Sequence, residues 1–395
     1  MDSSPLPTVQ RAIVQGPDGY PLIISPRHPI PPLRRGQVLV RVHAVALNPT
    51  DYKMPSNFAS PGAVCGCDFS GEVVATDLSS STESNGAQVV LAPGDAVFGC
   101  VHGSNPIDKD RGAFAEYVIA EADLICKAPR EMGWLQAGAW GGIGWSTLGI
   151  ALWESDRGLG LRWPWGQYNK NKERAVLNEG DPVDRPGAYV LVNGGATATG
   201  TLAIQLLKLA GYTPIATCSS DNAAFVRSFG AAQTFDYNSP SCGHSIRAQT
   251  KNLLKYVLDC IADTASTQLC YAAMARAGGR YVCLELPATS VLEARKAVQW
   301  RFVMGYEIFG REIALSNGYE RDGSMGADHK KRAVRWAQEV QRLIDGGWLK
   351  GHRLEQLEGR WEDSVLKGLE RLRTGGVRGS KLVVEVHKGM ALNAR

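Results

Sequence analysis

Ala188-Tyr189-Val190-Leu191-Val192-Asn193-Gly194-Gly195-Ala196-Thr197-Ala198-Thr199-Gly200 is the stretch that decides the fold. A short apolar run typical of a strand leads into a glycine-bearing turn. Apolar residues at helical spacing follow, from Leu202 to Leu209. Glycines in such a turn let the backbone approach a pyrophosphate, which then rests on the free N–H groups and positive end of the helix. This context favours a dinucleotide site over a plain strand–helix turn.

Strand and helix signals continue to alternate beyond this stretch. Strands are predicted at residues 213–218, 255–260 and 280–286, and helices at 222–229 and 264–276. Such alternation is the pattern of a doubly wound parallel sheet with helices on both faces. The sequence therefore predicts an α/β fold for the middle of the chain.

The flanking regions carry a different pattern. Period-two alternation at 37–45 and short runs at 71–75, 96–98 and 113–118 predict a small β-rich domain. An amphipathic helix after about residue 327, a helix at 362–371 and a strand at 381–386 resemble that first domain more than the middle one. The predicted division is therefore 1–165, 166–325 and 326–395, with the last segment returning to the first. Residues 154–187 are predicted as a surface loop at the junction and 78–87 as a polar insertion.

The composition excludes several classes of protein. With 44% hydrophobic and 21% charged residues, the 395-residue chain is too apolar for disorder. Lys+Arg 43 against Asp+Glu 39 is too balanced for a protein of nucleic acid or membrane surfaces. Nine cysteines without a Cys-x-x-Cys pair argue against a disulfide framework and a four-thiolate zinc site, so we expect reduced thiols. The first residues also lack the pattern of a secretory signal, which points to the cytoplasm.

One uncharged stretch, residues 132–153, is long enough to span a bilayer. Its six glycines, with Gln136, Ser146 and Thr147, make it a poor membrane helix. We predict a buried helix that lines a cavity.

The end of the second Rossmann strand indicates which dinucleotide is bound. An NAD site usually places an acidic residue there, whereas this chain has Cys218-Ser219-Ser220-Asp221-Asn222. Neutral hydroxyls can bond a 2′-phosphate, and Asp221 is equally explained as a helix N-cap. Arg227 either adds charge to that phosphate or faces solvent. We therefore predict NADPH, with Tyr237 as a further candidate contact to its adenine or ribose.

Several motifs spread along the chain carry a family resemblance. They are Asn48-Pro49-Thr50-Asp51, Gly-Cys-Asp-Phe-Ser-Gly at 66–71, Pro93-Gly94-Asp95, Gly-Ala-Phe-Ala-Glu-Tyr at 112–117 and Gly-Ser-Lys-Leu-Val-Val at 379–384. With these the chain resembles the zinc-independent medium-chain dehydrogenase/reductases. Asn-Pro-Thr-Asp-Tyr-Lys-Met at 48–54, Tyr256-Val257-Leu258-Asp259-Cys260 and Ile308-Phe309-Gly310 are most similar to the fungal trans-acting enoyl reductases of polyketide synthases, the lovastatin type. The resemblance implies a GroES-like β-rich substrate domain plus a doubly wound Rossmann nucleotide-binding domain.

The chain also departs from related patterns. Thr197 stands where quinone-reductase-like members usually have glycine. Zinc-dependent alcohol dehydrogenases carry Gly-His-Glu where this chain has Gly66-Cys67-Asp68, and a four-cysteine loop where it has only Cys100. Cys67, Asp68 and His102 are residue types that could supply three zinc ligands, but their spacing matches no recurrent pattern of zinc-binding residues. We expect no metal.

The resemblance implies a reaction and a partner. NADPH would reduce the α,β-double bond of an enoyl thioester carried by the acyl carrier domain of a polyketide synthase, or of a polyketide synthase–peptide synthetase hybrid, in secondary metabolism. The protein would be a monomer. One alternative is a free-standing quinone or enone reductase. The other is a non-catalytic, cofactor-bound accessory subunit of the synthase, which is suggested by the changed turn at Thr197 and by the absence of a tyrosine at position 53.

The chemistry needs hydride at the β-carbon, stabilisation of the thioester oxygen and a proton at the α-carbon. Related reductases often place a tyrosine five residues after the motif asparagine, and this chain has Lys53 there. An ammonium can polarise the enolate oxygen or relay a proton. Lys53 is equally explained as a cofactor contact or a surface lysine, and solvent can deliver the proton.

The remaining site residues fall into two sets. The expected cofactor contacts are Asn48, Pro49, Thr50, Asp51, Gly194, Ala196, Thr197, Ala198, Thr199, Ser219, Ser220, Asp221, Asn222, Tyr237, Leu284, Glu285, Val383 and Val384. The resemblance places the substrate against Trp140, Gly141, Gly142, Ile143, Gly144, Trp145, Ser146, Thr147, Val303, Met304, Gly305, Tyr306 and Glu307. The glycines at 141, 142 and 144 would leave room for an acyl chain, with Trp140 and Trp145 as apolar walls; a core role for each tryptophan is as easily explained.

Charge is concentrated near the end of the chain. Residues 321–388 hold 15 Lys/Arg against 10 Asp/Glu. A cationic face there could steer an acidic carrier domain, although exposed helices also look basic by chance.

Overall fold

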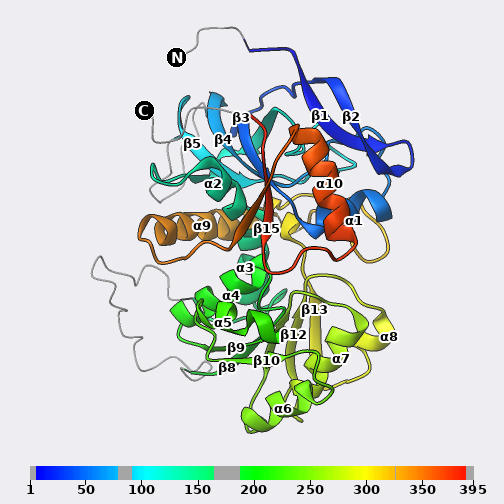
Figure 1. Ribbon diagram of the computed structural model, residues 1–395, viewed down its shortest axis with the longest axis vertical. Helices are drawn as coiled ribbons and strands as arrows, with labels where there is room; N and C mark the ends of the chain where they lie inside the picture. Colours follow the sequence, from blue (N-terminus) through cyan, green and yellow to red (C-terminus); the bar gives the residue numbers. More distant parts are fainter. Residues whose placement is uncertain (1–5, 79–90, 164–186, 325, 388–395) are drawn as a thin grey trace. The chain divides into compact units, whose positions relative to one another are not determined.

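A six-stranded parallel sheet forms from the middle of the chain, as the alternating pattern predicted. The computed structural model describes residues 6–78, 91–163, 187–324 and 326–387. The strands of this sheet lie in the order β10-β9-β8-β11-β12-β13. Figure 1 shows this region in green to yellow. Counted along the chain, the spatial order is 3-2-1-4-5-6, which is the doubly wound order. The chain adds strands on one side of β8 up to β10 and on the other side from β11 onward, so the point where the order reverses lies between β8 and β11. The strands are β8 (Tyr189–Asn193), β9 (Thr213–Cys218), β10 (Gln233–Asp236), β11 (Tyr256–Asp259), β12 (Gly279–Cys283) and β13 (Val298–Phe302).

The central strands of this sheet are buried on both faces. Val190, Leu191 and Val192 in β8 and Val257 and Leu258 in β11 are completely buried. Continuous apolar runs of this kind are typical of parallel strands covered by helices on either side. The helices are α3 (Ile143–Trp153), α4 (Ala198–Leu209), α5 (Ala223–Arg227), α6 (Cys242–Gln249), α7 (Thr264–Ala273) and α8 (Thr289–Leu292), with the 3₁₀ turn η2 (Ser220–Asn222).

The chain divides into two compact units at positions that differ from the predicted boundaries. The Rossmann unit comprises Gly144–Gly305 and Gly346–Lys350, so it begins and ends about twenty residues earlier than 166–325. Segment 154–163, predicted as part of a surface loop, is tied to the sheet. Arg280 of β12 donates to the carbonyls of Ser155 and Leu159, and Arg301 of β13 to that of Asp156. Residues 164–186 of that loop and 79–87 of the polar insertion lie outside the described residues.

The β-rich unit comprises Met1–Ile143, Tyr306–Asp345 and Gly351–Arg395. Its main sheet has the order β14-β15-β3-β4-β5-β7, with β6 paired to β3, and β1 and β2 form a separate antiparallel pair. The strands are β1 (Val9–Gly16), β2 (Gly19–Pro29), β3 (Gln37–Ala46), β4 (Asp68–Asp77), β5 (Ala96–Cys100), β6 (Tyr117–Glu121), β7 (Cys126–Lys127), β14 (Leu354–Leu357) and β15 (Lys381–Glu385).

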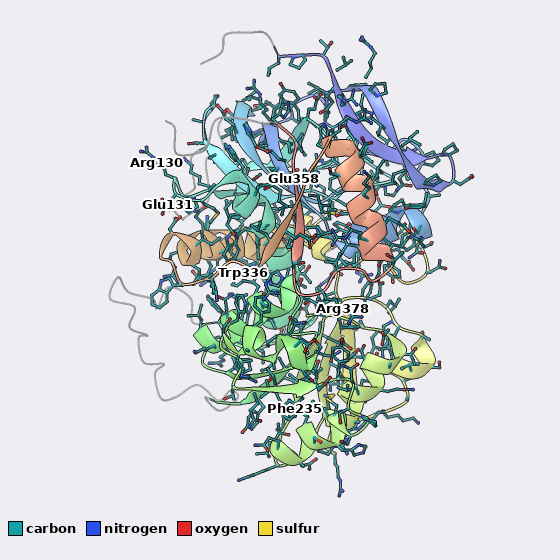
Figure 2. All side chains as sticks on the ribbon, in the orientation of Figure 1. Arg130, Glu131, Phe235, Trp336, Glu358 and Arg378 are labelled. Atoms are coloured by element: carbon teal, nitrogen blue, oxygen red, sulfur yellow. The ribbon has the colours of Figure 1, made fainter. Side chains whose placement is uncertain are left out.

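The C-terminal segment is part of this unit because β15 pairs antiparallel with β3, in a register that sets Val383 against Ala46. The helices of the unit are α1 (Pro49–Asn57), α2 (Trp134–Trp140), α9 (Gly326–Asp345) and α10 (Trp361–Arg373), with η1 (Ala122–Leu124) and η3 (Gly305–Phe309). Trp336 of the amphipathic α9, labelled in Figure 2, is 3% exposed. Gln341 of the same helix bonds the backbone N–H and carbonyl of Lys127 in β7.

Two further expectations can be compared with the structure. All nine cysteines are free, and eight of them are buried. The uncharged stretch 132–153 is broken into α2 and α3 at Gly141, and no helix in the described part of the chain is long and apolar enough to cross a membrane.

Candidate active site

Helix α1 carries the predicted Asn48–Asp51 motif at its start. Pro49 occupies the first helical position, where its missing N–H costs nothing. The carboxylate of Asp51 accepts a hydrogen bond from the backbone N–H of Asn48 at 2.7 Å. Burial raises the pKa of Asp51 to about 7, and the nearby Asp68 carboxylate adds to the rise. The hydrogen bonds of Asp51 with Asn48 N–H and with Cys67 act in the opposite direction on this pKa, but they do not outweigh burial.

A buried ionic network lies beside this motif. The Asp68 carboxylate accepts hydrogen bonds from the backbone N–H groups of Gly142 (2.8 Å) and Ile143 (2.9 Å), from the Asn48 amide (2.9 Å) and from the Lys381 ammonium (3.0 Å). Lys381 also donates to the Asn48 amide oxygen. The Asn48 side chain, expected to contact the cofactor, therefore has both of its ends occupied within the protein.

The break between α2 and α3 is made by this carboxylate. Gly141 has φ +48°, and a Cβ placed there would lie 2.3 Å from the Asp68 carboxyl carbon. A Cβ on Gly142 would lie 2.3 Å from the backbone nitrogen of Cys100. These two glycines were expected to leave room for an acyl chain, but protein atoms fill that space, and their role is close packing. Gly144, where a Cβ would have only a 3.8 Å contact with Thr199, remains open.

A second cluster lies on the other side of the motif. The Tyr306 hydroxyl is 2.7 Å from the Thr50 hydroxyl and 3.2 Å from the Cys67 sulfur. The Tyr306 ring stacks on His102, with centroids 3.9 Å apart. Burial raises the pKa of Tyr306 and of Cys67 well above their usual values and lowers the pKa of His102 to about 3. All three groups are therefore uncharged at neutral pH.

Lys53 lies one turn after Thr50 on α1 and is half-buried. Residues three apart on a helix share a face, so the ammonium and the Thr50 hydroxyl come from the same side of α1.

In the Rossmann unit, the turn between β8 and α4 has the form expected of a phosphate cradle. Gly194 has φ +81°, and a Cβ on Gly200 would lie 2.4 Å from the Gly194 carbonyl oxygen. The Thr197 hydroxyl caps α4 by accepting from Gly200 N and donates to the Gly194 carbonyl, both at 2.9 Å. The hydroxyl that replaces the usual glycine thus ties the turn together. Because the first N–H groups of a helix lack partners within it, those of Ala198 and Thr199 are left for a ligand.

A buried aspartate is hydrogen-bonded to the residue that precedes this turn. Asp259, at the end of β11, is completely buried and accepts from Asn193 (2.8 Å), Ser266 (2.8 Å) and Tyr281 (2.9 Å), and from the N–H groups of Ile261 and Ala262. Asn193 immediately precedes the glycine turn. Asp259 therefore fixes the start of the turn relative to the neighbouring strand.

The tip of β9 carries Ser219 and Ser220, as expected, but the neighbouring strand adds a carboxylate. Ser220 donates to Asp236 at the end of β10, and Asp236 also accepts from Asn238. These bonds hold the pKa of Asp236 below its usual value. This carboxylate comes from β10, because parallel pairing sets Asp236 beside Cys218. Arg227 donates to Thr234 at 2.8 Å.

The predicted N-cap is displaced by one position from Asp221. Residues Ser220–Asn222 form η2, and Asn222 is the residue before α5, with its amide donating to the Ser219 hydroxyl. Tyr237, directly after β10, is 46% exposed and therefore accessible to a ligand.

The expected substrate residues are divided between the two units. Trp140–Ile143, Tyr306 and Glu307 belong to the β-rich unit, and Gly144–Thr147 and Val303–Gly305 to the Rossmann unit. Trp145 is 1% exposed and lies in the core. Glu307 is equally buried and forms an ion pair with Arg321 at 2.9 Å, which indicates a structural role. Val383 and Val384 are buried strand residues of β15, and Glu285 accepts a bond from Leu286 N just after β12.

Comparison with known proteins bears directly on this site. Residues 34–130 match the model of the alcohol dehydrogenase GroES-like domain, and 198–312 that of the zinc-binding dehydrogenases. The trans-enoyl reductase ffsC of Aspergillus flavipes is 45% identical over 98% of both chains, and ccsC of Aspergillus clavatus is 43% identical over 96% of this chain and 97% of its own. The chain belongs to the trans-enoyl reductase branch of the medium-chain dehydrogenase/reductases. A putative zinc-dependent alcohol dehydrogenase from Rhizobium etli shares the fold, with 22% identity, a TM-score of 0.70 and coverage of 97% of this chain and 99% of its own.

This membership confirms the resemblance, the GroES-like plus Rossmann fold and the enoyl reductase class expected from the sequence. A nicotinamide cofactor follows from the family.

The residues of this reductase do not fit a catalytic zinc ion. Such an ion needs three side-chain ligands with free lone pairs. Asp68 accepts four hydrogen bonds, one of them from an ammonium, and Cys67 and His102 both contact Tyr306. Across the described ranges no cluster of three His, Cys, Asp or Glu side chains is placed to hold a metal.

Part of the C-terminal surplus of positive charge is compensated by acids outside the segment, because Arg321, Lys330 and Lys381 pair with Glu307, Asp123 and Asp68. Eight of the basic side chains that the structure describes between 321 and 387 form ion pairs. These are Arg321, Lys330, Lys331, Arg342, Arg360, Arg371, Arg373 and Lys381.

Sequence reasoning missed the structural role of three residues of the reductase: Asp68, Lys381 and Asp259. All three stand in quoted motifs, so the signal was present, but the partners of Asp68 lie 20, 74 and 313 positions away.

Substituting Gly141 tests the contact that breaks the helix. Gly141→Ala forces a Cβ into the Asp68 carboxyl group at a positive φ, and we expect it to lower the free energy of unfolding by about 3 kcal/mol. Gly133→Ala, at the start of the same α2 with nothing within 4 Å of its Cβ, is the matched control and should cost less than about 1 kcal/mol. Urea unfolding of both variants measures the difference; equal losses would contradict this account.

The raised pKa of Asp51 predicts a pH dependence of stability. Between pH 4 and 7 the folded protein keeps a proton that the unfolded chain has released, so this group makes the native state less stable as the pH rises through that window. Asp51→Asn keeps an acceptor for Asn48 N–H and removes the titration. The difference in free energy of unfolding between the variant and the wild type should therefore shift in favour of the variant as the pH rises from 4.5 to 8, by about 2–4 kcal/mol. A difference that stays constant with pH would exclude the raised pKa.

Proposed function

We propose that the protein is a trans-acting NADPH enoyl reductase that reduces the α,β-double bond of an enoyl thioester carried by the acyl carrier domain of a polyketide synthase or a synthase–peptide synthetase hybrid. The observation that carries the proposal is the 45% identity to a trans-enoyl reductase over 98% of both chains. The cradle before α4 and the misfit of a zinc ion support it, because reduction of a double bond needs a dinucleotide and no metal.

The chain's own residues fit a dinucleotide. The close approach of Gly194 and Gly200 and the N–H groups of Ala198 and Thr199 would hold its pyrophosphate. When bound, NADPH supplies the hydride for the β-carbon.

The remaining task of the protein is to stabilise charge on the thioester oxygen. Thr50 and Lys53 offer two donors from one face of α1, and Tyr306 holds the Thr50 hydroxyl in place. Because burial keeps Tyr306 protonated, it can act as the donor to Thr50, which then directs its own hydrogen outward. In this proposal Lys53 is the catalytic residue and Tyr306 a positioning residue.

The choice of NADPH over NADH rests on the tip of β9. The Ser219 hydroxyl accepts from Asn222 and can still donate there, whereas Ser220 donates to Asp236. The Asp236 carboxylate is thus bonded by Ser220 and by Asn238. Arg227 is exposed and bonded to a neutral hydroxyl, so its charge is available to a 2′-phosphate. Arg227 and Asp236 act in opposite directions on the pKa of Cys218 at the strand tip, which places both within electrostatic reach of this edge.

We also propose that the reductase acts as a cytoplasmic monomer. Nine free cysteines suit a reducing compartment. Its synthase partner is inferred from the names of its relatives.

The reaction is tested with a pantetheine-linked enoyl thioester. The purified protein should oxidise NADPH in its presence, and Lys53→Ala should lower kcat by about 100-fold, as expected for loss of an acid or an electrostatic donor. Lys367→Ala, on the exposed face of α10, is the control and should leave kcat unchanged.

Other outcomes distinguish the alternatives. A higher KM for NADPH with an unchanged kcat would make Lys53 a cofactor contact. Faster reduction of quinones or small enones than of the thioester would favour the free-standing reductase. Cofactor binding without hydride transfer to any acceptor would favour the accessory subunit.

The cofactor preference is tested at Arg227. Arg227→Ala should raise KM for NADPH about 10-fold and leave KM for NADH unchanged, because only NADPH carries the 2′-phosphate. Arg276→Ala is the matched control, since this exposed arginine lies before β12, which is three strands away from β9 in the sheet. Equal effects on both cofactors would exclude a role for Arg227 in phosphate recognition.

A further inference from the structure

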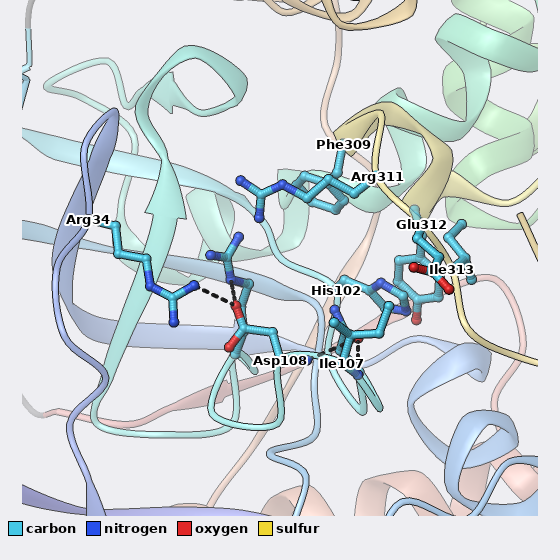
Figure 3. A pocket seen from close by; sticks show the side chains of 11 residues that line it. Arg34, His102, Ile107, Asp108, Phe309, Arg311, Glu312 and Ile313 are labelled. Atoms are coloured by element: carbon cyan, nitrogen blue, oxygen red, sulfur yellow. Dashed lines mark hydrogen bonds and ion pairs between the residues drawn. The ribbon is translucent and has the colours of Figure 1, made fainter. Parts of the chain in front are cut away.

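A cavity of about 270 Å³ in the β-rich unit lies next to the groups assigned above (Figure 3). It is lined by segments 102–111 and 306–313, with Arg34 from the loop before β3. Its volume is just below the range of about 300–1,000 Å³ at which pockets bury a drug-sized ligand. It therefore suits a small molecule or one segment of a longer one.

The cavity shares a wall with the candidate active site. Tyr306 lines it, and the hydroxyl of the same side chain bonds Thr50 of α1. His102, stacked on that ring, also lines the cavity. It is 5% exposed, and its buried Nε2 has no partner among the described residues. A buried polar atom without a partner costs free energy, so this nitrogen is a place where a ligand's polar group would be stabilised.

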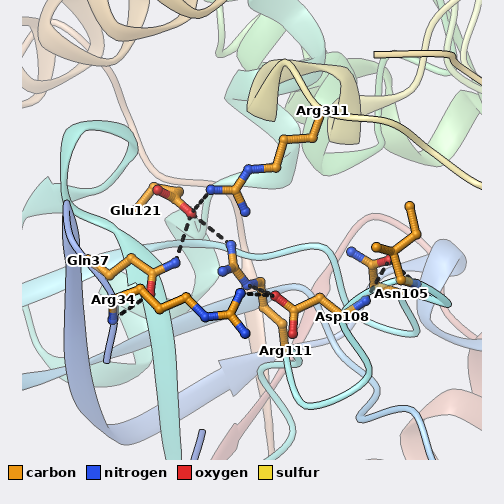
Figure 4. A network of polar contacts seen from close by, with 8 residues as sticks. Arg34, Gln37, Asn105, Asp108, Arg111, Glu121 and Arg311 are labelled. Carbon is orange, nitrogen blue, oxygen red and sulfur yellow. Dashed lines mark hydrogen bonds and ion pairs between the residues drawn. The ribbon is translucent and has the colours of Figure 1, made fainter. Parts of the chain in front are cut away.

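Arginines surround one end of the cavity. Arg111 is 7% exposed and bonds Asp108 (3.2 Å) and Glu121 (2.8 Å), and Arg311 bonds the same Glu121 oxygen at 2.7 Å (Figure 4). Although burial opposes it, the charges of Arg311, Arg111 and Lys330 hold the pKa of Glu121 below its usual value. Arg34 is 65% exposed and only 3.9 Å from Asp108.

The charges at this end do not cancel. Arg34, Arg111 and Arg311 face the two carboxylates of Asp108 and Glu121, which leaves one positive charge in excess. Glu312, the other acid that lines the cavity, lies beside Ile313, away from Arg34 (Figure 3). Guanidinium groups with spare donors are the preferred partners of phosphate in proteins.

The rest of the lining is apolar or neutral. Ile107, Phe309 and Ile313 provide hydrophobic contacts, and Ile107 is 55% exposed at the edge. Asn105 accepts from Ile107 N through its amide oxygen, so its NH₂ group remains a donor. The cavity therefore combines arginines that can bind an anion at one end, polar groups of His102 and Asn105 that can bond amides, and apolar walls between them.

From this arrangement, and resting on the proposed function, we propose that the cavity binds the 4′-phosphopantetheine arm of the thioester substrate, with its phosphate between Arg34 and Arg311. The arm has the matching sequence of groups: a phosphate, a branched apolar segment and amides. The same arm occurs on carrier domains and in coenzyme A.

The test compares thioesters that share one enoyl group. The pantetheine and 4′-phosphopantetheine forms differ only in the phosphate, and KM for the phosphorylated form should be about 10-fold lower. Arg34→Ala should remove most of that advantage without changing kcat for the pantetheine form. Arg378→Ala, an exposed arginine of the same unit, should preserve it. Arg311→Lys, which keeps the charge near Glu121, should retain part of it.

A binding measurement separates this inference from the proposed function. Calorimetry with 4′-phosphopantetheine alone should show binding that weakens with salt and with Arg34→Ala, whether or not any thioester is reduced. Reduction of both thioesters with equal KM, and no heat of binding, would overturn the inference and leave the proposed function intact. An advantage seen with phosphopantetheine but lost with the coenzyme A thioester would assign the arm to a carrier domain; an equal advantage would show that the arm is recognised from either source.

Discussion

The structure depends on satisfying buried carboxylates. Each unit encloses a buried aspartate that accepts hydrogen bonds from at least four donors, Asp68 in the β-rich unit and Asp259 in the Rossmann unit. A carboxylate removed from water is tolerated only when its lone pairs are occupied. These two residues therefore determine the position of the backbone around them: the α2–α3 break for Asp68, and the dinucleotide turn for Asp259.

This requirement accounts for why Asp68 does not fit the role of a zinc ligand. The ammonium of Lys381 provides the positive charge next to Asp68, and the Asn48 amide bridges the two. The same groups hold the start of α1, from which Thr50 and Lys53 extend. Ion pairing within the protein thus provides a rigid support for the residues proposed to act on the substrate.

Tyr306 lies between the proposed catalytic residues and the cavity proposed to hold the substrate's arm. Its hydroxyl contacts Thr50, and its ring, with His102, forms the inner wall of the arginine-lined cavity. A thioester held by its arm and by its reacting end would contact both sides of one side chain. Neutral, buried groups at this position keep the wall free of charge at physiological pH.

The sequence by itself determined the elements and the family. Apolar periodicity predicted β3, β8, β9, α7, α9 and α10 nearly at their bounds, and the alternation of strands and helices predicted a doubly wound parallel sheet, because these depend on neighbouring residues. It could not reveal that Asp236 lies beside Ser220, that Gly141 accommodates Asp68, or that Arg34, Arg111 and Arg311 meet around one cavity. Those contacts join positions tens to hundreds of residues apart, and only the packing of strands and loops decides which distant charges and lone pairs satisfy one another.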